Sequence, residues 1–488
     1  MNRKELETLW TETLSSGKPT EAQFGNVAAA IVEVHSSGDT RFGQHIANRL
    51  KQITDRTGRS FDANAFDISM SRLLVADEIG FASWNDLTNA ISDPAENAKP
   101  LLFQYAVAAM VRGDFSALES MVGGPEKFHE QIVVWYQQGY FGDEQETLAE
   151  VFSAACMLGH ARTAEYLLYK GVDPYAGMKT GLSGFHYAAS SGRLDVIKLL
   201  IDRKVPMEVK NMYNGTVFEQ AIWSAVNEHT PNHAEIVEEL IKAGAVVDEG
   251  YDEWWEDQDV PDAETKRRIA DVLRRHDEFR ARLDLARQKV DEAESDGSKR
   301  ALADSLKGLG DLLRRPPFLR DAANEVYQRA ANLYKETGLP LEEAWVKRHI
   351  GINHEYAGRL EEAEKYYDEA LSLYRRHSNE DDLNYANAVR YPAVIKERLG
   401  KKNEAARLWE EACDRYGRIH PDGLGEGVAE AAAWLTILAL EREDLDVAGK
   451  WFARASEASS RSQDPATHKF VEEVRARLGE EVGELSET

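Results

Sequence analysis

The sequence predicts an all-α solenoid, a fold in which helical repeats stack along the chain. Similar segments recur 33 residues apart in the first half of the chain, and a second pattern recurs every 40 to 43 residues in the second half. The length of 488 residues also exceeds what one hydrophobic core normally supports. A repeat of this size cannot bury its apolar face alone, so each unit is expected to stack on its neighbours.

Composition and charge limit the partners and the compartment. The chain carries 85 acidic and 59 basic side chains, and its formal net charge of -26 repels nucleic-acid phosphates and anionic lipids. The first residues contain no apolar signal region, and the longest apolar stretch, residues 431–440, has about half the length of a membrane span. Two cysteines are too few for a disulfide framework. We therefore expect a cytoplasmic protein with no nucleic-acid and no membrane partner.

Residues 1–97 are predicted to form a helical N-terminal module without internal repeats. Residues 68–91 have the apolar spacing of an amphipathic helix. This segment contains the sequence GFASWNDL, in which Trp84 is expected to anchor the core. Residues 92–100, SDPAENAKP, are predicted to link the module to the repeats that follow.

The 33-residue spacing joins three segments that follow this linker. Small residues, glycines and leucines recur in the same order: Ala155 and Ala188, Gly159 and Gly192, Leu167 and Leu200, then Phe185 and Phe218, Ala188 and Ala221. Alanines allow two helices to approach closely, and the glycines end a helix in a backbone conformation that is unfavourable for other residues. The leucines are expected to pack against the next repeat.

These segments resemble ankyrin repeats. The second copy is the most complete, because Ser183, Gly184, Phe185 and His186 occupy the four positions of the family's signature turn. The resemblance implies about four ankyrin units and closing helices over residues 98–278, with His160 and His186 hydrogen-bonded to turn backbone. The sequence GFASWNDL is similar to a segment found ahead of bacterial ankyrin arrays, so the chain resembles bacterial ankyrin-repeat proteins.

The second pattern, Ala-x3-aromatic-x2-Ala, recurs four times after residue 300. Its first alanines are Ala323, Ala363, Ala405 and Ala448. Spacings of four and seven residues place each trio on one stripe of a helix. The stripe resembles the second helix of a tetratricopeptide repeat, in the lengthened form known from kinesin light chains. The resemblance implies about four such units within residues 279–488, after a break predicted at residues 291–299.

The sequence contains no convincing motif for catalysis or cofactor binding. Nucleophile-elbow and zinc-protease motifs do not occur, and the glycine-rich stretches lack the preceding apolar strand of a phosphate-binding loop. His229 and His233 have the spacing of a helical zinc pair, but Pro231 lies between them and no third ligand has motif spacing. We therefore expect no enzyme activity, no cofactor and no bound metal.

The tetratricopeptide resemblance implies a binding groove lined by the first helix of each unit. Counting back from the alanines places cations at position 5 of three first helices, with a tryptophan and an asparagine at position 2. These candidates are Lys307, Arg348, Arg390, Trp345 and Asn387. Because a guanidinium group binds a carboxylate through two parallel hydrogen bonds, they predict a site for an acidic or carboxylate-ended peptide. The alternative is that the cations pair with local acids such as Glu355 and Glu397.

Residues 251–259, YDEWWEDQD, suggest a second surface. Tyr251, Trp254 and Trp255 lie among acids in a segment that we expect to be a loop after the last full repeat. Tryptophan and tyrosine are frequent in binding hot spots, which favours a recognition site. Both tryptophans could instead cover the hydrophobic end of the stack, which every solenoid must protect.

These observations predict a non-catalytic scaffold or adaptor that binds protein or peptide ligands on the grooves of its solenoids. The prediction depends on the resemblance and on the lack of a reactive site, because a fold alone does not define a function. Three alternatives remain open. They are an inhibitor or immunity-type protein that neutralises a specific enzyme or toxin, a peptide-sensing regulator, and an enzyme whose site lies in residues 1–97.

Overall fold

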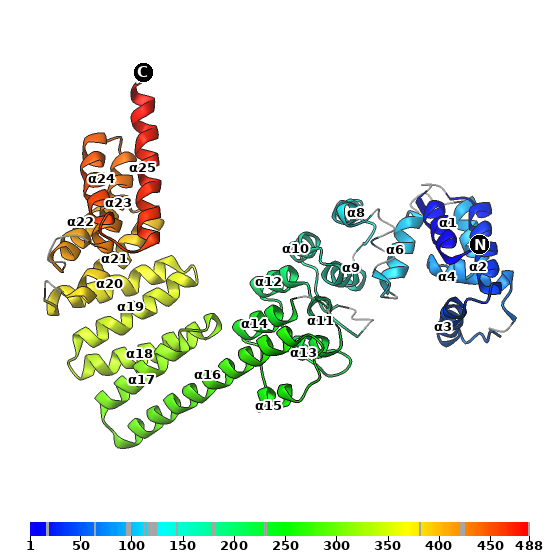
Figure 1. Ribbon diagram of the computed structural model, residues 1–488, viewed down its shortest axis with the longest axis horizontal. Helices are drawn as coiled ribbons and strands as arrows, with labels where there is room; N and C mark the ends of the chain where they lie inside the picture. Colours follow the sequence, from blue (N-terminus) through cyan, green and yellow to red (C-terminus); the bar gives the residue numbers. More distant parts are fainter. Residues whose placement is uncertain are drawn as a thin grey trace. The chain divides into compact units, whose positions relative to one another are not determined.

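The computed structural model describes residues 1–486 except 16–18, 63–64, 94–98, 112, 116–118, 120–123, 143–144, 177–180, 229, 231, 380–381 and 420–424. Every regular element in this described part of the chain is a helix, which confirms the all-α solenoid class (Figure 1). The chain divides into two compact units, residues 1–275 and residues 276–488. Part of the linker expected at residues 92–100 falls outside the described residues.

The first unit begins with α1 (Arg3–Ser15), α2 (Glu21–Ser36), α3 (Thr40–Thr57), α4 (Ile68–Glu78) and α5 (Trp84–Ser92). The segment 68–91, whose spacing predicted helix, forms the two helices α4 and α5, because Gly80 adopts a left-handed φ of 89° and the hydroxyl of Ser83 caps the start of α5. Trp84 is half-buried against the core of these helices, with the guanidinium of Arg72 5.2 Å from its ring centroid. Trp84 therefore contacts the core, as predicted, but lies at its edge.

The remaining helices of the first unit include three consecutive pairs with the 33-residue spacing. The elements are α6 (Leu101–Val111), α8 (Pro125–Gln137), α9 (Gln145–Leu158), α10 (Ala161–Tyr169), α11 (Gly184–Ser190), α12 (Leu194–Asp202), α13 (Val217–Asn227) and α14 (His233–Ala243). Ala155, Ala188 and Ala221 are fully buried where the first helices of successive pairs pack. Gly159 and Gly192 both have positive φ angles and end the first helix of their pairs, as the spacing predicted.

Two predicted loops are replaced by helix at the end of this stack. Residues 251–259 were expected to be a loop, but Tyr251–Glu256 form the short helix α15. The helix α16 (Ala263–Asp296) continues far beyond the closing segment expected at residues 263–278. The break expected at residues 291–299 is therefore limited to Gly297, which has a φ of 72°, and Ser298, whose hydroxyl caps the next helix. The boundary between the two compact units, after Arg275, falls within the residue range of α16.

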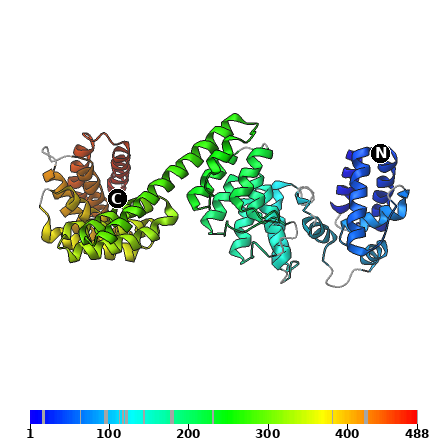
Figure 2. The ribbon, with the colours of Figure 1, turned by 90° about the horizontal axis from the view of Figure 1, so that it is seen from below.

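The second unit contains four helix pairs and a final helix. The pairs are α17 (Lys299–Leu313) with α18 (Arg320–Glu336), α19 (Pro340–Tyr356) with α20 (Leu360–His377), α21 (Leu383–Arg398) with α22 (Lys402–Ile419), and α23 (Glu426–Leu440) with α24 (Leu445–Ser459). The chain ends with α25 (Pro465–Ser486). Consecutive helices pack side by side through this unit, coloured green to red in Figure 2.

The predicted stripe of small and aromatic residues forms the interior of these pairs. The first and last alanine of each stripe are buried on all four second helices, and Tyr327, Tyr367 and Trp409 are fully buried between them. Gly310 and Gly351 on the first helices lie against the rings of Tyr327 and Tyr367, where an added Cβ atom would approach ring carbons to 2.6 Å. A small residue on one helix thus accommodates an aromatic ring from the other.

Candidate protein-binding surfaces

The three predicted cations lie on successive first helices, α17, α19 and α21, and each reaches toward the next first helix. Lys307 Nζ donates to Glu342 Oε2 at 2.8 Å and lies 4.2 Å from the ring centroid of Trp345. Arg390 donates from Nε and Nη2 to the two carboxylate oxygens of Glu430, at 2.6 and 2.7 Å. Burial acts to lower the pKa of Arg390, but these hydrogen bonds raise it above its usual range. Lys307 and Arg390 are therefore neutralised within the array.

Arg348 differs from both of these cations. It is only 6 % exposed, and its Nη atoms meet only oxygens of Asn384, at 3.2 to 3.4 Å. Its Nε is buried and has no hydrogen-bond partner. Among the residues that the structure describes, no carboxylate lies within ion-pair distance of this guanidinium. A buried cation without a counterion is unfavourable unless a ligand supplies the negative charge.

The described groups in direct contact with Arg348 are aromatic or neutral. Trp345 stacks on the ring of His349, with centroids 3.7 Å apart, and Tyr391 lies 6.0 Å from the guanidinium carbon. Burial lowers the pKa of His349 to about 3, so its imidazole is uncharged at neutral pH. Asn387 accepts a hydrogen bond from the hydroxyl of Tyr416 at 2.7 Å. The predicted residues therefore lie on one series of helices, and Arg348 is the one of the three cations that pairs with no acid in the described part of the chain.

The acids named in the ion-pair alternative do not contact these cations. Glu355 accepts a hydrogen bond from the hydroxyl of Tyr367 at 2.7 Å and pairs with Arg398 at 3.2 Å. The acids that pair with Lys307 and Arg390 come instead from the next first helix. Sequence spacing alone does not identify such partners, because they depend on how adjacent units pack.

The structure separates the three aromatic residues of the second predicted surface. Trp255 is fully buried in the core of the ankyrin region, and its indole nitrogen donates to the carbonyl of Lys266 at 3.0 Å. Its side chain covers the end of the stack and is closed to a ligand. Trp254 is 45 % exposed, and the half-buried Tyr251 packs between Trp254 and Phe218 with ring centroids 5.2 and 5.4 Å away.

Tyr251 and Trp254 border a larger cavity on the ankyrin region, which we call the aromatic groove. Its volume is about 1080 Å³, and its aromatic lining consists of Tyr187, Tyr213, Trp223, Tyr251 and Trp254. Sequence reasoning missed the first three because they are spread over separate repeats and form no local cluster. Stacking of α11, α13 and α15 brings them to one cavity.

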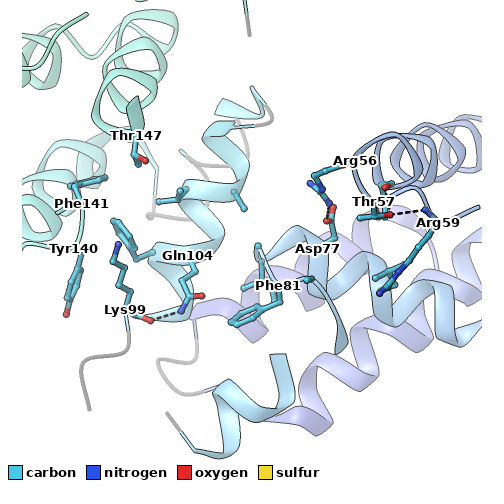
Figure 3. Close-up of a pocket in the computed structure, with 18 residues that line it drawn as sticks. Arg56, Thr57, Arg59, Asp77, Phe81, Lys99, Gln104, Tyr140, Phe141 and Thr147 are labelled. Atoms are coloured by element: carbon cyan, nitrogen blue, oxygen red, sulfur yellow. Dashed lines mark hydrogen bonds and ion pairs between the residues drawn. The ribbon is translucent and has the colours of Figure 1, made fainter. Parts of the chain in front are cut away.

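A second cavity of about 470 Å³ lies among α3, α4, α6 and the start of α9 (Figure 3). Arg56 and Asp77 point toward each other across it, and they form an ion pair. Arg49 also pairs with Asp77, at 3.0 Å. Gln104 donates to the backbone carbonyl of Lys99 at 2.9 Å. Arg49, Arg56 and Asp77 therefore compensate one another's charge beside this cavity.

The histidines and cysteines that the structure describes have structural surroundings. Nε2 of His186 lies 3.2 Å from the carbonyl oxygen of Gly215, the predicted contact with turn backbone, whereas His160 lies 2.6 Å from Glu119 Oε1. No group of three or more potential metal ligands occurs in the described part, and His229 lies outside it. Cys156 and Cys413 are buried. Within the same described residues, no helix has the length and apolarity to cross a membrane.

The fold and these surfaces define the class of a helical repeat protein. The family model for ankyrin repeats (3 copies) matches residues 152–250, and the model for the tetratricopeptide repeat matches residues 342–418. The chain therefore carries the two repeat types that its sequence predicted. Ankyrin and tetratricopeptide repeats are protein-interaction modules, which indicates a protein-interaction scaffold with protein partners.

Two solved structures match this chain with low sequence identity and low TM-scores. BtubC (BKLC) from P. vanneervenii is 20% identical, with 50% of this chain and 92% of that chain covered and a TM-score of 0.34. A Signal Transduction ATPase with Numerous Domains protein with a tetratricopeptide repeat sensor, from Pyrococcus horikoshii, is 13% identical. That match covers 95% of this chain and 71% of the other chain, with a TM-score of 0.32. No curated protein matches the chain.

Proposed function

We propose that the protein is a non-catalytic adaptor that holds protein ligands on the grooves of its two repeat arrays. We further propose that the tetratricopeptide groove takes an acidic or carboxylate-ended segment of a partner. The presence of both repeat types supports the adaptor function. The ligand class is supported by the surroundings of the predicted cations.

The observation that carries the ligand class is the guanidinium of Arg348, which forms no ion pair with the residues that the structure describes. Its hydrogen bonds to Asn384 are long compared with the usual 2.7–2.9 Å of a charged pair, and the acceptors are neutral amide oxygens. A ligand carboxylate that displaced the Asn384 side chain would accept two parallel hydrogen bonds and supply the missing negative charge. Asn384 is exposed, so rotation of its side chain opens the guanidinium to a ligand without unfolding α21.

The neighbouring residues favour a peptide over a free anion. Trp345 and Tyr391 present aromatic surface beside Arg348, where apolar side chains next to the carboxylate can pack. Lys307 and Arg390 remain paired with their own acids, so the groove offers one strong anion position and not three. Affinity then depends on one carboxylate and its apolar neighbours.

A titration with a defined probe tests this proposal. The probe is a fluorescein-labelled peptide of twelve residues with alternating Glu and Leu and a free carboxyl terminus, measured by anisotropy at 0.15 M salt. At this ionic strength the repulsion from the net charge of -26 is screened over about 8 Å. Arg348→Met should weaken binding at least tenfold, or about 1.4 kcal/mol. Arg376→Met, which removes one exposed cation from α20, is the matched control and should leave the affinity within twofold.

An unchanged affinity of the Arg348→Met variant would refute the anion site. If the substitution does weaken binding, comparison of the peptide with a free carboxyl terminus and its amidated form distinguishes a carboxylate-ended ligand from an internal acidic one. A terminal carboxylate is the recognised group if amidation weakens binding as much as the substitution does. An internal acidic side chain is recognised if amidation has little effect.

A further inference from the structure

The aromatic groove carries unusually exposed aromatic side chains. Tyr213 is 77 % exposed, Trp223 53 % and Trp254 45 %. Tyr187 and Tyr251, both half-buried, complete the lining. Tyr187 and Tyr251 pack against the core that contains Trp255 and Phe218, whereas Tyr213, Trp223 and Trp254 are not part of that core cluster. Exposed aromatic surface of this kind is typical of an interaction site.

The turn that carries Tyr213, at one side of the groove, is held in place by hydrogen bonds of Asn211. Oδ1 of Asn211 accepts hydrogen bonds from the backbone N–H groups of Tyr213 and Gly215, both at 2.9 Å. Its Nδ2 donates to Gln220 Oε1 at 3.0 Å, which fixes the turn to α13. Asn214 holds a left-handed φ of 63° at the tip. A ligand therefore meets an ordered tyrosine, and little conformational entropy is lost on binding.

The charges around this groove are predominantly negative. The segment 248–262 contains no Lys or Arg and eight acids, Asp248, Glu249, Asp252, Glu253, Glu256, Asp257, Asp259 and Asp262. Glu219 and Glu228 lie in the lining itself. Glu219 pairs with Lys210 at 3.3 Å, whereas Glu228 is exposed and forms no ion pair with any residue in the described part of the chain.

The lining also contains one cation, Arg193, whose Nε donates to the backbone carbonyl of Met157 at 2.8 Å. The pKa of Tyr251 nevertheless responds to the negative charges. Burial, together with the negative charges of Glu219 and Asp248, raises the pKa of Tyr251 to about 12. The hydroxyl of Tyr251 therefore stays protonated, and the acids around it disfavour any added negative charge.

We infer that the aromatic groove binds a basic segment of a protein partner, with Arg or Lys side chains over the faces of Tyr213, Trp223 and Trp254. Aromatic faces attract cations, and the attraction increases when the bound segment excludes water from these exposed rings. Glu228 lines the groove and supplies charge complementarity, and the acidic segment 248–262 adds a negative field from the sequence around Tyr251 and Trp254. An acidic segment would be repelled, and a purely apolar helix would leave these carboxylates without partners. The inference rests on the proposed adaptor function and assigns the ligand class of its ankyrin array.

The test uses the full-length chain and two labelled peptides of twelve residues. One alternates Arg and Leu, and the other is the Glu and Leu probe described above. The Trp223→Ala/Trp254→Ala double variant removes aromatic surface without changing the charge, and it should weaken binding of the basic peptide at least tenfold. Tyr169→Ala, at a position 83 % exposed on α10 of the same unit, is the matched control and should bind within twofold of the wild type. Glu228→Gln should weaken binding about threefold and reduce its salt dependence.

Binding of the basic peptide to the double variant with wild-type affinity would overturn the inference, because bulk negative charge would then suffice. The acidic peptide separates this failure from failure of the adaptor function. If only the acidic peptide binds, and does so through Arg348, the inference fails and the proposed function stands. If neither peptide binds the full-length chain, both proposals fail.

Discussion

Replacement of Arg348 by methionine should remove the anion site without loss of stability, whereas the same change at Arg390 should destabilise the array. The contacts of Arg348 with Asn384 are long, so together they contribute about 1–2 kcal/mol. Burying an unpaired cation opposes folding by several kcal/mol, and methionine retains most of the packing. We therefore expect Arg348→Met to change the free energy of unfolding by about 0 to +2 kcal/mol, in the stabilising direction.

Arg390 gives the opposite expectation because it forms two hydrogen bonds with Glu430, at 2.6 and 2.7 Å. Arg390→Met leaves the partly buried carboxylate of Glu430 unpaired. The loss should be about 1–3 kcal/mol, between the values for exposed and buried pairs. Hydrogen exchange of the amides in α19 and α21 measures the local opening free energy of both variants, supported by urea unfolding. If Arg348→Met destabilises these helices as much as Arg390→Met does, Arg348 is a structural cation and the argument for an anion site is refuted.

Three further predictions concern packing and titration. Gly310→Ala should destabilise the array by about 1–3 kcal/mol, because the new Cβ meets the ring of Tyr327 at 2.6 Å. Gly308→Ala on the same helix places its Cβ in open space and should stabilise the array by up to about 1 kcal/mol. Equal effects of the two variants in urea unfolding would contradict this. The pKa of His349 is lowered to about 3, so the unfolded chain binds its proton more tightly and stability should fall by about 1.4 kcal/mol per unit as pH drops from 6.5 toward 3. A His349→Phe variant should lose that part of the acid sensitivity, and an unchanged pH profile would argue against it. Trp255→Ala should lower the free energy of unfolding of the first unit by about 3–5 kcal/mol, and Trp254→Ala by less than about 1 kcal/mol, as thermal unfolding can show.

The sequence predicted the repeats well because their physical signals are local or periodic. The stripes around Tyr327, Tyr367 and Trp409 lie in the interiors of the pairs, since a spacing of four and seven residues fixes one face of a helix. Gly159 and Gly192 end helices because a positive φ is specified by the residue itself. These features need no knowledge of the neighbouring unit.

Features that depend on contacts between units could not be predicted in the same way. The number of residues between Arg390 and its partner Glu430 follows from loop lengths and packing, so counting within one repeat did not identify the pair. Trp254 and Trp255 are adjacent in an acidic segment, and only the formation of α15 directs one outward and the other into the core. Tyr213 gave no signal at all, because its importance arises from aromatic residues of other repeats.

If the proposed function is correct, the contrast among the three cations accounts for selection of an acidic ligand by an acidic chain. Each cation reaches the next first helix, where Lys307 meets Glu342, Arg348 meets Asn384 and Arg390 meets Glu430. Glu342 and Glu430 neutralise the positive charges of Lys307 and Arg390, whereas the uncharged Asn384 does not neutralise that of Arg348. The pairs on either side also hold α17, α19, α21 and α23 together, so the guanidinium of Arg348 is positioned before a ligand arrives. A single unneutralised cation between two neutralised ones restricts the anion to one position, and the adjacent aromatic rings then determine which residues can accompany it.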